Sequence, residues 1–191
     1  MILINKQKGS ISESEVKLSS KPLLAAKEIA IFAICAALMF ALKMALIWLP
    51  NIHFGALLII IYTLTFRYKA LYIIYLYVIM EIIVFGFNPM WSIGYLYVWT
   101  LLAGIVFLFR KMEDPLGWAV LAGAFGLFFG ALMAPPFLLL TIEPSQFFRA
   151  FIPYWASGFF FDLVHCTGNF ALTLFLFKPL TKVMKKVYVK P

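Results

Sequence analysis

The amino-acid sequence predicts an all-α integral membrane protein with six transmembrane helices and both termini in the cytoplasm. Three observations support this fold class. Of the 191 residues, 64% are hydrophobic and only 13% are charged, which is typical of membrane proteins. The hydrophobic residues form runs long enough to cross a bilayer core of roughly 30 Å. The basic residues cluster in alternate connections between these runs, as the positive-inside rule requires.

We expect one membrane domain flanked by two tails. Residues 1–27 are polar and contain no apolar segment followed by a cleavage site, so they are predicted to form a flexible cytoplasmic tail and not a signal peptide. Residues 28–178 form the six-helix membrane domain, and residues 179–191 form a basic tail at the membrane interface. Both cysteines, Cys35 and Cys166, lie in apolar segments, which argues against a disulfide framework.

The six predicted transmembrane helices follow the apolar runs in order. Their expected bounds are Glu28–Leu49, His53–Phe66, Lys69–Gly86, Trp91–Phe109, Leu116–Leu140 and Tyr154–Phe177. The second is short, about 21 Å as a helix. The fifth begins with Asp114 as N-cap and Pro115 at the first helical position. Its pair Pro135 and Pro136 should kink the helix or end it early.

The first predicted helix carries a series of alanines at every fourth position. These are Ala33, Ala37, Ala41 and Ala45. This spacing gives a shallow groove of methyl groups that winds slowly around the helix. Small residues permit the close packing that holds helices together in lipid. The groove either packs against another helix of this chain or docks a separate membrane protein. Gly126 and Gly130, at GxxxG spacing, predict a second small-residue face on the fifth helix.

Positive charge sets the predicted orientation. Fourteen of the sixteen lysine and arginine residues fall on one side of the six-helix arrangement, in the two tails and in the second and fourth connections. The positive-inside rule assigns this side to the cytoplasm. The net charge of +8 is therefore explained by membrane topology and does not indicate nucleic-acid binding. The exceptions are Lys43, inside the first helix, and Arg149, in the predicted outer loop Thr141–Pro153.

Four ionisable side chains lie inside predicted helices, where a functional role is the default hypothesis. They are Lys43, Glu81, Asp162 and His165. Lys43 and Glu81 lie about 8–9 Å below the outer ends of their helices, and Asp162 about 12 Å. All four therefore fall in or near the outer half of the membrane. Asp162, His165 and Asn169 share one helix face. The structural alternative is an ion pair between Lys43 and Asp162 that locks two helices together.

Polar and aromatic residues near the outer ends predict a solute cavity that opens to the outside and is sealed below. The remaining candidates for this substrate-binding cavity are Asn51, His53, Asn88, Trp91, Tyr95, Trp99, Tyr154 and Asn169. The alternative for the tyrosines and tryptophans is an ordinary aromatic belt at the membrane interface. We predict no cofactor, no metal site and no catalytic residue.

One weak motif supports an alternative function. His165 and Asn169 match an HxxxN pattern of intramembrane CAAX-type proteases, although the paired-glutamate segment of those enzymes is missing. An intramembrane enzyme that uses His165, Asn169 and Glu81 is therefore the alternative. The sequence also lacks HExxH, GxSxG and GxxxxGK[ST], so metalloprotease, hydrolase and ATPase activities lack their residues. A channel would need a polar path through the inner half, which the sequence does not contain.

In these features the chain resembles the substrate-binding S components of energy-coupling factor (ECF) transporters. Besides the topology and the alanine series, the resemblance rests on the LPNI turn at Leu49–Ile52, GYLYVW at Gly94–Trp99 and FDLVHCTGN at Phe161–Asn169. It extends from about Lys27 to Lys178. It implies a multi-pass protein of the cell membrane that is not an enzyme. Such a protein captures a water-soluble vitamin in an outward-facing cavity as a subunit of an ABC importer.

The resemblance also implies partners and a class of substrate. S components dock through the small-residue face of the first helix onto a transmembrane coupling protein with two cytoplasmic ATPases, and load by toppling in the membrane. No nucleic-acid partner is implied. Cobalamin and pantothenate are the leading substrates. Lys43 would pair with a carboxylate such as that of pantothenate, whereas the many aromatic residues would suit a large planar ring such as cobalamin or a flavin.

Overall fold

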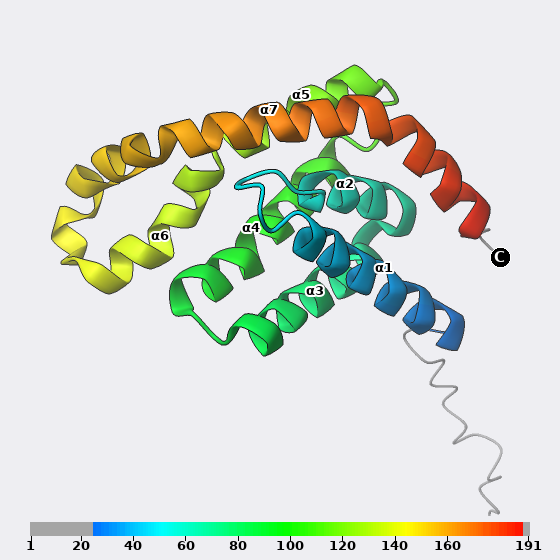
Figure 1. Ribbon diagram of the computed structural model, residues 1–191, viewed down its shortest axis with the longest axis horizontal. Coiled ribbons are helices and arrows are strands. Elements are labelled where there is room, and N and C mark those ends of the chain that lie inside the picture. The colour runs from blue at the N-terminus through cyan, green and yellow to red at the C-terminus, as the bar shows by residue number, and fades with distance from the viewer. Residues whose placement is uncertain (1–24, 189–191) are drawn as a thin grey trace, which may run out of the picture.

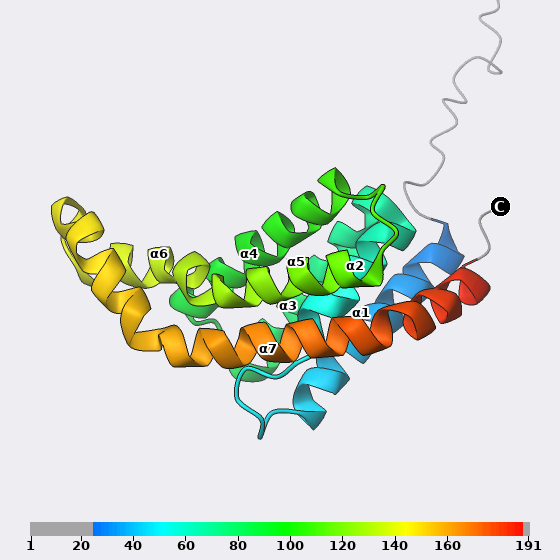
Figure 2. The same cartoon turned by 90° about the horizontal axis from the view of Figure 1, so that it is seen from above.

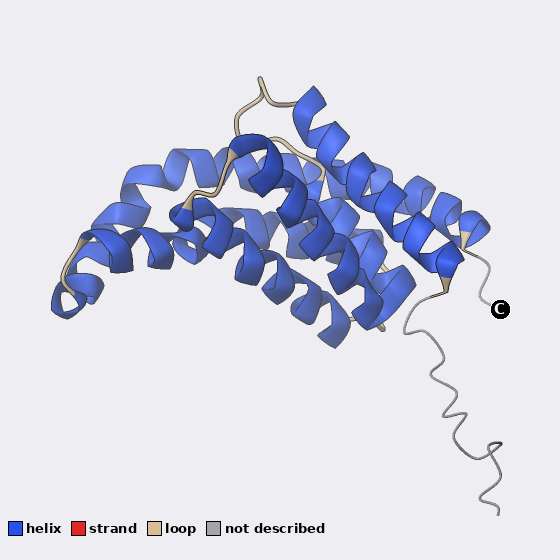
Figure 3. Ribbon diagram, turned by 90° about the horizontal axis from the view of Figure 1, so that it is seen from below, coloured by secondary structure: helices blue, strands red, loops and turns tan. Residues whose placement is uncertain are grey.

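The computed structural model describes residues 25–188, and all regular structure in this range is helical (Figures 1 and 3). The α-helices are α1 (Ala26–Ala45), α2 (Gly55–Phe66), α3 (Ala70–Phe85), α4 (Pro89–Leu108), α5 (Pro115–Leu127), α6 (Phe129–Thr141) and α7 (Phe147–Val187). Two short 3-10 helices, η1 (Arg67–Lys69) and η2 (Pro144–Gln146), precede α3 and α7. Most of the predicted N-terminal tail lies outside the described residues.

Five helical stretches of the described chain are long and apolar enough to cross a membrane. They are Ala26–Ala45, Gly55–Phe85, Pro89–Leu108, Pro115–Thr141 and Pro144–Val187, with mean hydropathies between 1.4 and 2.0. The second stretch contains two helices, α2 and α3, joined through η1. The chain is therefore an all-helical protein whose apolar helices are compatible with several membrane crossings.

Helices α1 to α5 reverse direction in turn, α6 continues from α5, and α7 returns along both, so that several helix ends meet at one end of the molecule, here called the basic end. Glu28, in the first turn of α1, pairs with Lys69 of the α2–α3 turn at 2.7 Å, and the Tyr188 hydroxyl after α7 donates to Glu28 at 3.3 Å. Arg67 and Arg110 line one cavity between the α2–α3 and α4–α5 turns. Figure 1 shows the start of α1 and the C terminus at this same end.

The fifth predicted helix is interrupted at Phe128, between α5 and α6, and it does not end at Pro135 and Pro136, which was one of the two outcomes predicted for this pair. Both prolines lie inside α6. Pro136 has no N–H to donate to the carbonyl oxygen of Leu132, four residues earlier. The hydroxyl of Tyr97 on α4 donates to that oxygen instead. This hydrogen bond satisfies the oxygen that Pro136 leaves without its helical donor.

Helix α7 is longer than predicted. Its 41 residues correspond to a length of roughly 60 Å. It begins at Phe147 and contains Pro153, so most of the predicted loop Thr141–Pro153 is helical. At its other end it runs unbroken to Val187, so no helix end marks the predicted domain boundary after residue 178. Helices α5 and α6 lie along α7, and the α6–α7 hairpin projects from the rest of the bundle (Figure 2).

Glycines of α5 bring it against α7. A Cβ on Gly126 would lie 2.8 Å from the carbonyl carbon and oxygen of His165, and one on Gly123 would lie 3.2 Å from Phe170. The second predicted small-residue face therefore packs within the chain. The buried face of α7 contains Asp162, His165, Asn169, Thr173 and Phe177. The prediction that the first three share one face is confirmed.

The alanine series lies on the outer face of α1. The exposed positions include Ala33, Ala37, Ala41 and Ala45. The buried positions of this helix are Phe32, Cys35, Ala36 and Met39. Within residues 25–188, the alanine series is therefore not covered by another helix.

Candidate functional site

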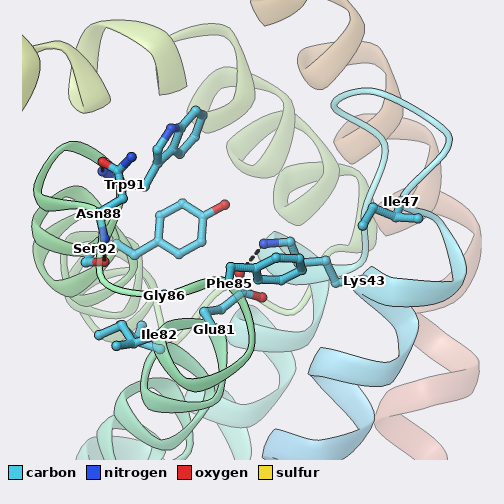
Figure 4. Close-up of a pocket in the computed structure, with 11 residues that line it drawn as sticks. Lys43, Ile47, Glu81, Ile82, Phe85, Gly86, Asn88, Trp91 and Ser92 are labelled. Atoms are coloured by element: carbon cyan, nitrogen blue, oxygen red, sulfur yellow. Dashed lines mark hydrogen bonds and ion pairs between the residues drawn. The ribbon is translucent and has the colours of Figure 1, made fainter.

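A cavity of about 390 Å³ opens between the C-terminal ends of α1 and α3 and the N-terminal end of α4 (Figure 4). Its lining consists of Lys43, Ile47, Val78, Glu81, Ile82, Phe85, Gly86, Asn88, Trp91, Ser92 and Tyr95. These helix ends lie away from the basic end of the bundle. The volume is at the small end of the range for ligand pockets, roughly 300–1,000 Å³.

The turn between α3 and α4 forms one wall of the cavity. Gly86 ends α3 with a φ of 83°, in the left-handed region that glycine adopts without strain. Asn88 then caps α4, because its Oδ1 accepts from the backbone N–H of Met90 at 3.0 Å and of Trp91 at 3.4 Å. Pro89 occupies the first turn. The cap uses the side-chain oxygen of Asn88, and its amide nitrogen is left to meet a ligand.

Lys43 of α1 and Glu81 of α3 form an ion pair at the cavity wall (Figure 4). Lys43 therefore pairs with Glu81 and not with Asp162. Glu81 is only 8% exposed, and its second oxygen, Oε1, has no hydrogen-bond partner among the described residues. This oxygen is itself enclosed by protein, so the accessible charge at the cavity wall is the Lys43 ammonium group, which the Glu81 carboxylate holds in place.

Aromatic rings surround the Lys43 ammonium group. Its Nζ lies 5.2 Å from the ring centre of Tyr95 and 5.3 Å from that of Phe85, within the range of cation–π attraction. The Tyr95 ring is edge-on to Trp91 at 6.1 Å and stacked on Tyr77 at 6.5 Å. The cavity therefore combines a cation, a carboxylate acceptor and aromatic faces, which suits a small polar solute with an apolar or planar part.

Three further candidates form a buried aromatic cluster beside the cavity. The His53 ring lies 4.7 Å from His165 and 5.9 Å from Trp99, and Trp99 lies 5.5 Å from Tyr95. His165 is 1% exposed, and neither of its nitrogens has a hydrogen-bond partner within residues 25–188. Trp99 packs against Tyr95, which lines the cavity, but none of the three cluster residues lines it.

Asp162 holds the interruption between α5 and α6. Its Oδ1 accepts from the backbone N–H of Gly130 at 2.8 Å, and its Oδ2 accepts from Nε1 of Trp155 at 2.8 Å. An interrupted helix exposes backbone N–H groups at its new N-terminus, which a carboxylate satisfies well. Asp162 therefore acts as a cap supplied by another helix.

Three other predicted site residues hold helices or loops together and do not line the cavity. The Asn169 amide donates to the carbonyl of Ala122 on α5 at 3.4 Å. The Asn51 amide donates to the carbonyl of Phe161 at 3.3 Å. The ring of Tyr154 stacks on a phenylalanine ring of α6 at 4.8 Å.

The structure thus brings part of the predicted site into one cavity. The predicted residues that line it are Lys43, Glu81, Asn88, Trp91 and Tyr95. Sequence reasoning missed the other six lining residues, which are Ile47, Val78, Ile82, Phe85, Gly86 and Ser92. Val78 and Phe85 stand three and four positions from Glu81, and Ser92 stands four from Asn88. Helical spacing from a residue already identified could have found these three.

The three residues of the alternative enzyme do not line one cavity. Neither His165 nor Asn169 lines the cavity that contains Glu81. Among the described residues, no group of three histidine, cysteine, aspartate or glutamate side chains lies close enough to hold a metal ion. No protein-family model, curated protein or solved structure matches the chain, so the case for a function rests on its own residues.

Proposed function

We propose that the chain is the substrate-binding subunit of an ECF-type ABC importer in the cell membrane, with both termini in the cytoplasm. The observation that carries the proposal is the cavity around Lys43 and Glu81, at helix ends away from the basic end. The positive-inside rule places the basic end in the cytoplasm. The cavity then opens to the outside, where a solute can enter it.

In this proposal α2 and α3 cross the membrane separately, which gives six crossings. At 12 residues, α2 measures about 18 Å and is shorter than a bilayer core of roughly 30 Å. All nine of its residues from Gly55 to Thr63 are buried by the rest of the protein. A helix that is surrounded by protein does not have to match the thickness of the lipid, because its ends need not reach the lipid surface.

The cavity favours a compact acid such as pantothenate over a corrinoid. About 390 Å³ is small for a ligand pocket, and a corrin ring with its side chains is a large ligand. The Lys43 ammonium and the Asn88 amide nitrogen can donate to a carboxylate. The rings of Trp91 and Tyr95 offer apolar faces to the rest of the same molecule.

The exposed alanine series of α1 is the proposed docking face for a transmembrane coupling protein with two cytoplasmic ATPases. Its methyl groups would let a partner helix approach closely in lipid. The chain has no phosphate-binding loop of its own. Energy for release into the cell must then come from the partner, and the chain itself is not an enzyme.

Reconstitution into vesicles tests this function. The chain alone should bind radiolabelled pantothenate but should not concentrate it inside. Addition of a coupling protein with its two ATPases should produce uptake that requires ATP on the cytoplasmic side. Concentrative uptake by the single chain, driven by a proton or sodium gradient, would contradict the proposal. Mass spectrometry of the small molecule retained after purification would identify the substrate independently.

A further inference from the structure

A second cavity lies at the basic end, between the α2–α3 turn and the α4–α5 turn. This basic pocket, of about 230 Å³, is lined by Thr63, Leu64, Arg67, Phe107, Arg110 and Lys111. Three of its six residues are cations and none is acidic. Within the described chain, the ion pairs are Lys43–Glu81 and Lys69–Glu28, so none of the three cations is neutralised by a carboxylate.

The acidic residues that follow in sequence do not fill the pocket. Asp114 uses its carboxylate to cap α5, accepting from the backbone N–H of Leu116 at 3.2 Å and of Gly117 at 3.1 Å. Glu113 is exposed and does not line the pocket. The Arg110 guanidinium lies over the ring of Phe107 at 4.5 Å, which holds it beside the pocket. The pocket therefore keeps an uncompensated positive charge.

A buried hydroxyl in the same wall lacks a partner. Thr63 is 4% exposed, and its Oγ1 makes no hydrogen bond within residues 25–188. Two residues later, Thr65 bonds back to the carbonyl of Ile61 at 2.8 Å, as helical threonines commonly do. A free hydroxyl donor beside three cations is suited to an anion with several acceptor oxygens, such as a phosphate group.

An apolar groove continues from the basic pocket between α3 and α4. The two share Thr63, Arg67 and Phe107, and the groove adds Tyr68, Leu71, Thr100, Ala103 and Gly104. A shallower cavity then extends it past Tyr75, Leu96, Leu101 and Ile105. At Gly104, a Cβ would have no neighbour within 4 Å, so this part of the groove is open. The groove gives an acyl chain an apolar path that starts at the anion pocket.

We propose that these two features form a binding site for an anionic phospholipid, with the phosphate in the basic pocket and one acyl chain in the groove. The groove lies along apolar helices, and the pocket lies where α2 and α4 end, at the level expected for lipid headgroups. The continuous groove favours a lipid over a free phosphate ion. This site is separate from the solute cavity and does not depend on the transport function.

Native mass spectrometry of the delipidated full chain tests the site, with phosphatidylglycerol and phosphatidylcholine titrated in parallel. Phosphatidylglycerol should bind more tightly, at one molecule per chain. The double variant Arg110→Gln/Lys111→Gln should weaken its binding by roughly 25-fold, because each basic residue near an anionic lipid contributes about fivefold. The matched control Lys182→Gln/Lys185→Gln removes two charges from α7 outside the pocket and should change binding little. Equal binding of the two lipids would overturn the proposal.

Two further measurements separate a lipid from a free anion. Gly104→Leu should fill the groove and weaken long-chain phosphatidylglycerol at least tenfold, without disturbing the fold, since the space there is empty. Inorganic phosphate at millimolar concentration should compete poorly with the long-chain lipid. Strong competition by phosphate, together with unchanged lipid binding by Gly104→Leu, would show a free-anion site and overturn the lipid assignment. Arg67→Gly, at a position whose φ of 58° and ψ of −133° favour glycine, gives an independent loss of charge.

Discussion

Glu81 meets Lys43 with only one of its two carboxylate oxygens, and the second oxygen is buried without a partner in the described chain. The pair holds the Lys43 ammonium group at the cavity wall, beside the rings of Phe85 and Tyr95. In the proposed function the pair is therefore a structural contact that also positions a cation for the ligand.

Glu81→Gln should weaken substrate binding by about 1–3 kcal/mol, because the amide keeps the size of the side chain but loses the charged acceptor. Isothermal titration calorimetry on the purified chain, with pantothenate as the probe, measures the change. Lys43→Met should give a loss of similar size. Unchanged affinity in both variants, accompanied by a lower melting temperature, would make the pair purely structural.

A charge-swapped variant provides the matched control. Lys43→Glu/Glu81→Lys keeps an ion pair between α1 and α3 but exchanges the positions of donor and acceptor. Its melting temperature should lie closer to that of the native chain than those of the single variants, whereas its affinity should stay low. Recovery of both properties would mean that the positions of the charges do not matter to the ligand.

Ala37→Trp or Ala41→Leu should abolish ATP-driven uptake in the reconstituted importer and leave substrate binding intact. Either side chain would stand out from the exposed face of α1 and prevent close approach of a partner helix. Ile79→Trp is the control, because Ile79 is 51% exposed on α3, away from the alanine series. Normal uptake by both alanine variants would refute the docking face.

Asp162→Ala should destabilise the protein by about 2–4 kcal/mol, since it removes the acceptor of two hydrogen bonds from a buried position. Asp162→Asn should destabilise the protein less than Asp162→Ala does, because its single amide oxygen can still accept from the backbone N–H of Gly130. Unfolding in mixed detergent micelles measures both. A loss of substrate affinity at unchanged stability would instead place Asp162 in the binding site.

Gly126→Ala should lower the melting temperature strongly, because the new methyl group would lie 2.8 Å from the backbone of His165. The backbone of α7 cannot yield as a flexible side chain can. Gly158→Ala is the matched control within the same pair of packed helices, since its Cβ would meet nothing within 4 Å. That variant should be neutral or slightly stabilising. Equal effects of the two changes would contradict the proposed close packing of α5 on α7.

The sequence was a good guide to where helices occur and a poor guide to where they end. Hydropathy marks every apolar run, and the Asp114–Pro115 and Asn88–Pro89 pairs begin helices by local chemistry. The prolines do not end α6, and the carbonyl oxygen that Pro136 leaves without a helical donor accepts from another helix, at the Tyr97 hydroxyl. The interruption at Phe128 has no local signal and is stabilised by Asp162, 34 residues later in the chain.

The candidate site was predicted in part for a similar reason. Depth in the membrane follows from counting residues along one helix, and it placed Lys43 and Glu81 at one level. Counting does not give the direction of a side chain relative to other helices. Asp162 and Asn169 therefore had suitable depth but face α5 and α6, where they bond to backbone groups. Only the packing of the helices separates the residues that line the cavity from those that bond to α5 and α6.

In the proposed importer, the contact between Lys43 and Glu81 also bears on how movement of the solute cavity would respond to voltage. Moving one elementary charge across a membrane changes its energy by about 2.3 kcal/mol per 100 mV. The two side chains carry opposite charges in direct contact, so together they add almost no net charge to the cavity. The pair itself would thus add almost no electrical work if the empty cavity changed its position in the membrane. With a monovalent anion bound, the same movement would be coupled to the membrane potential, and its rate would depend on the polarisation of the cell.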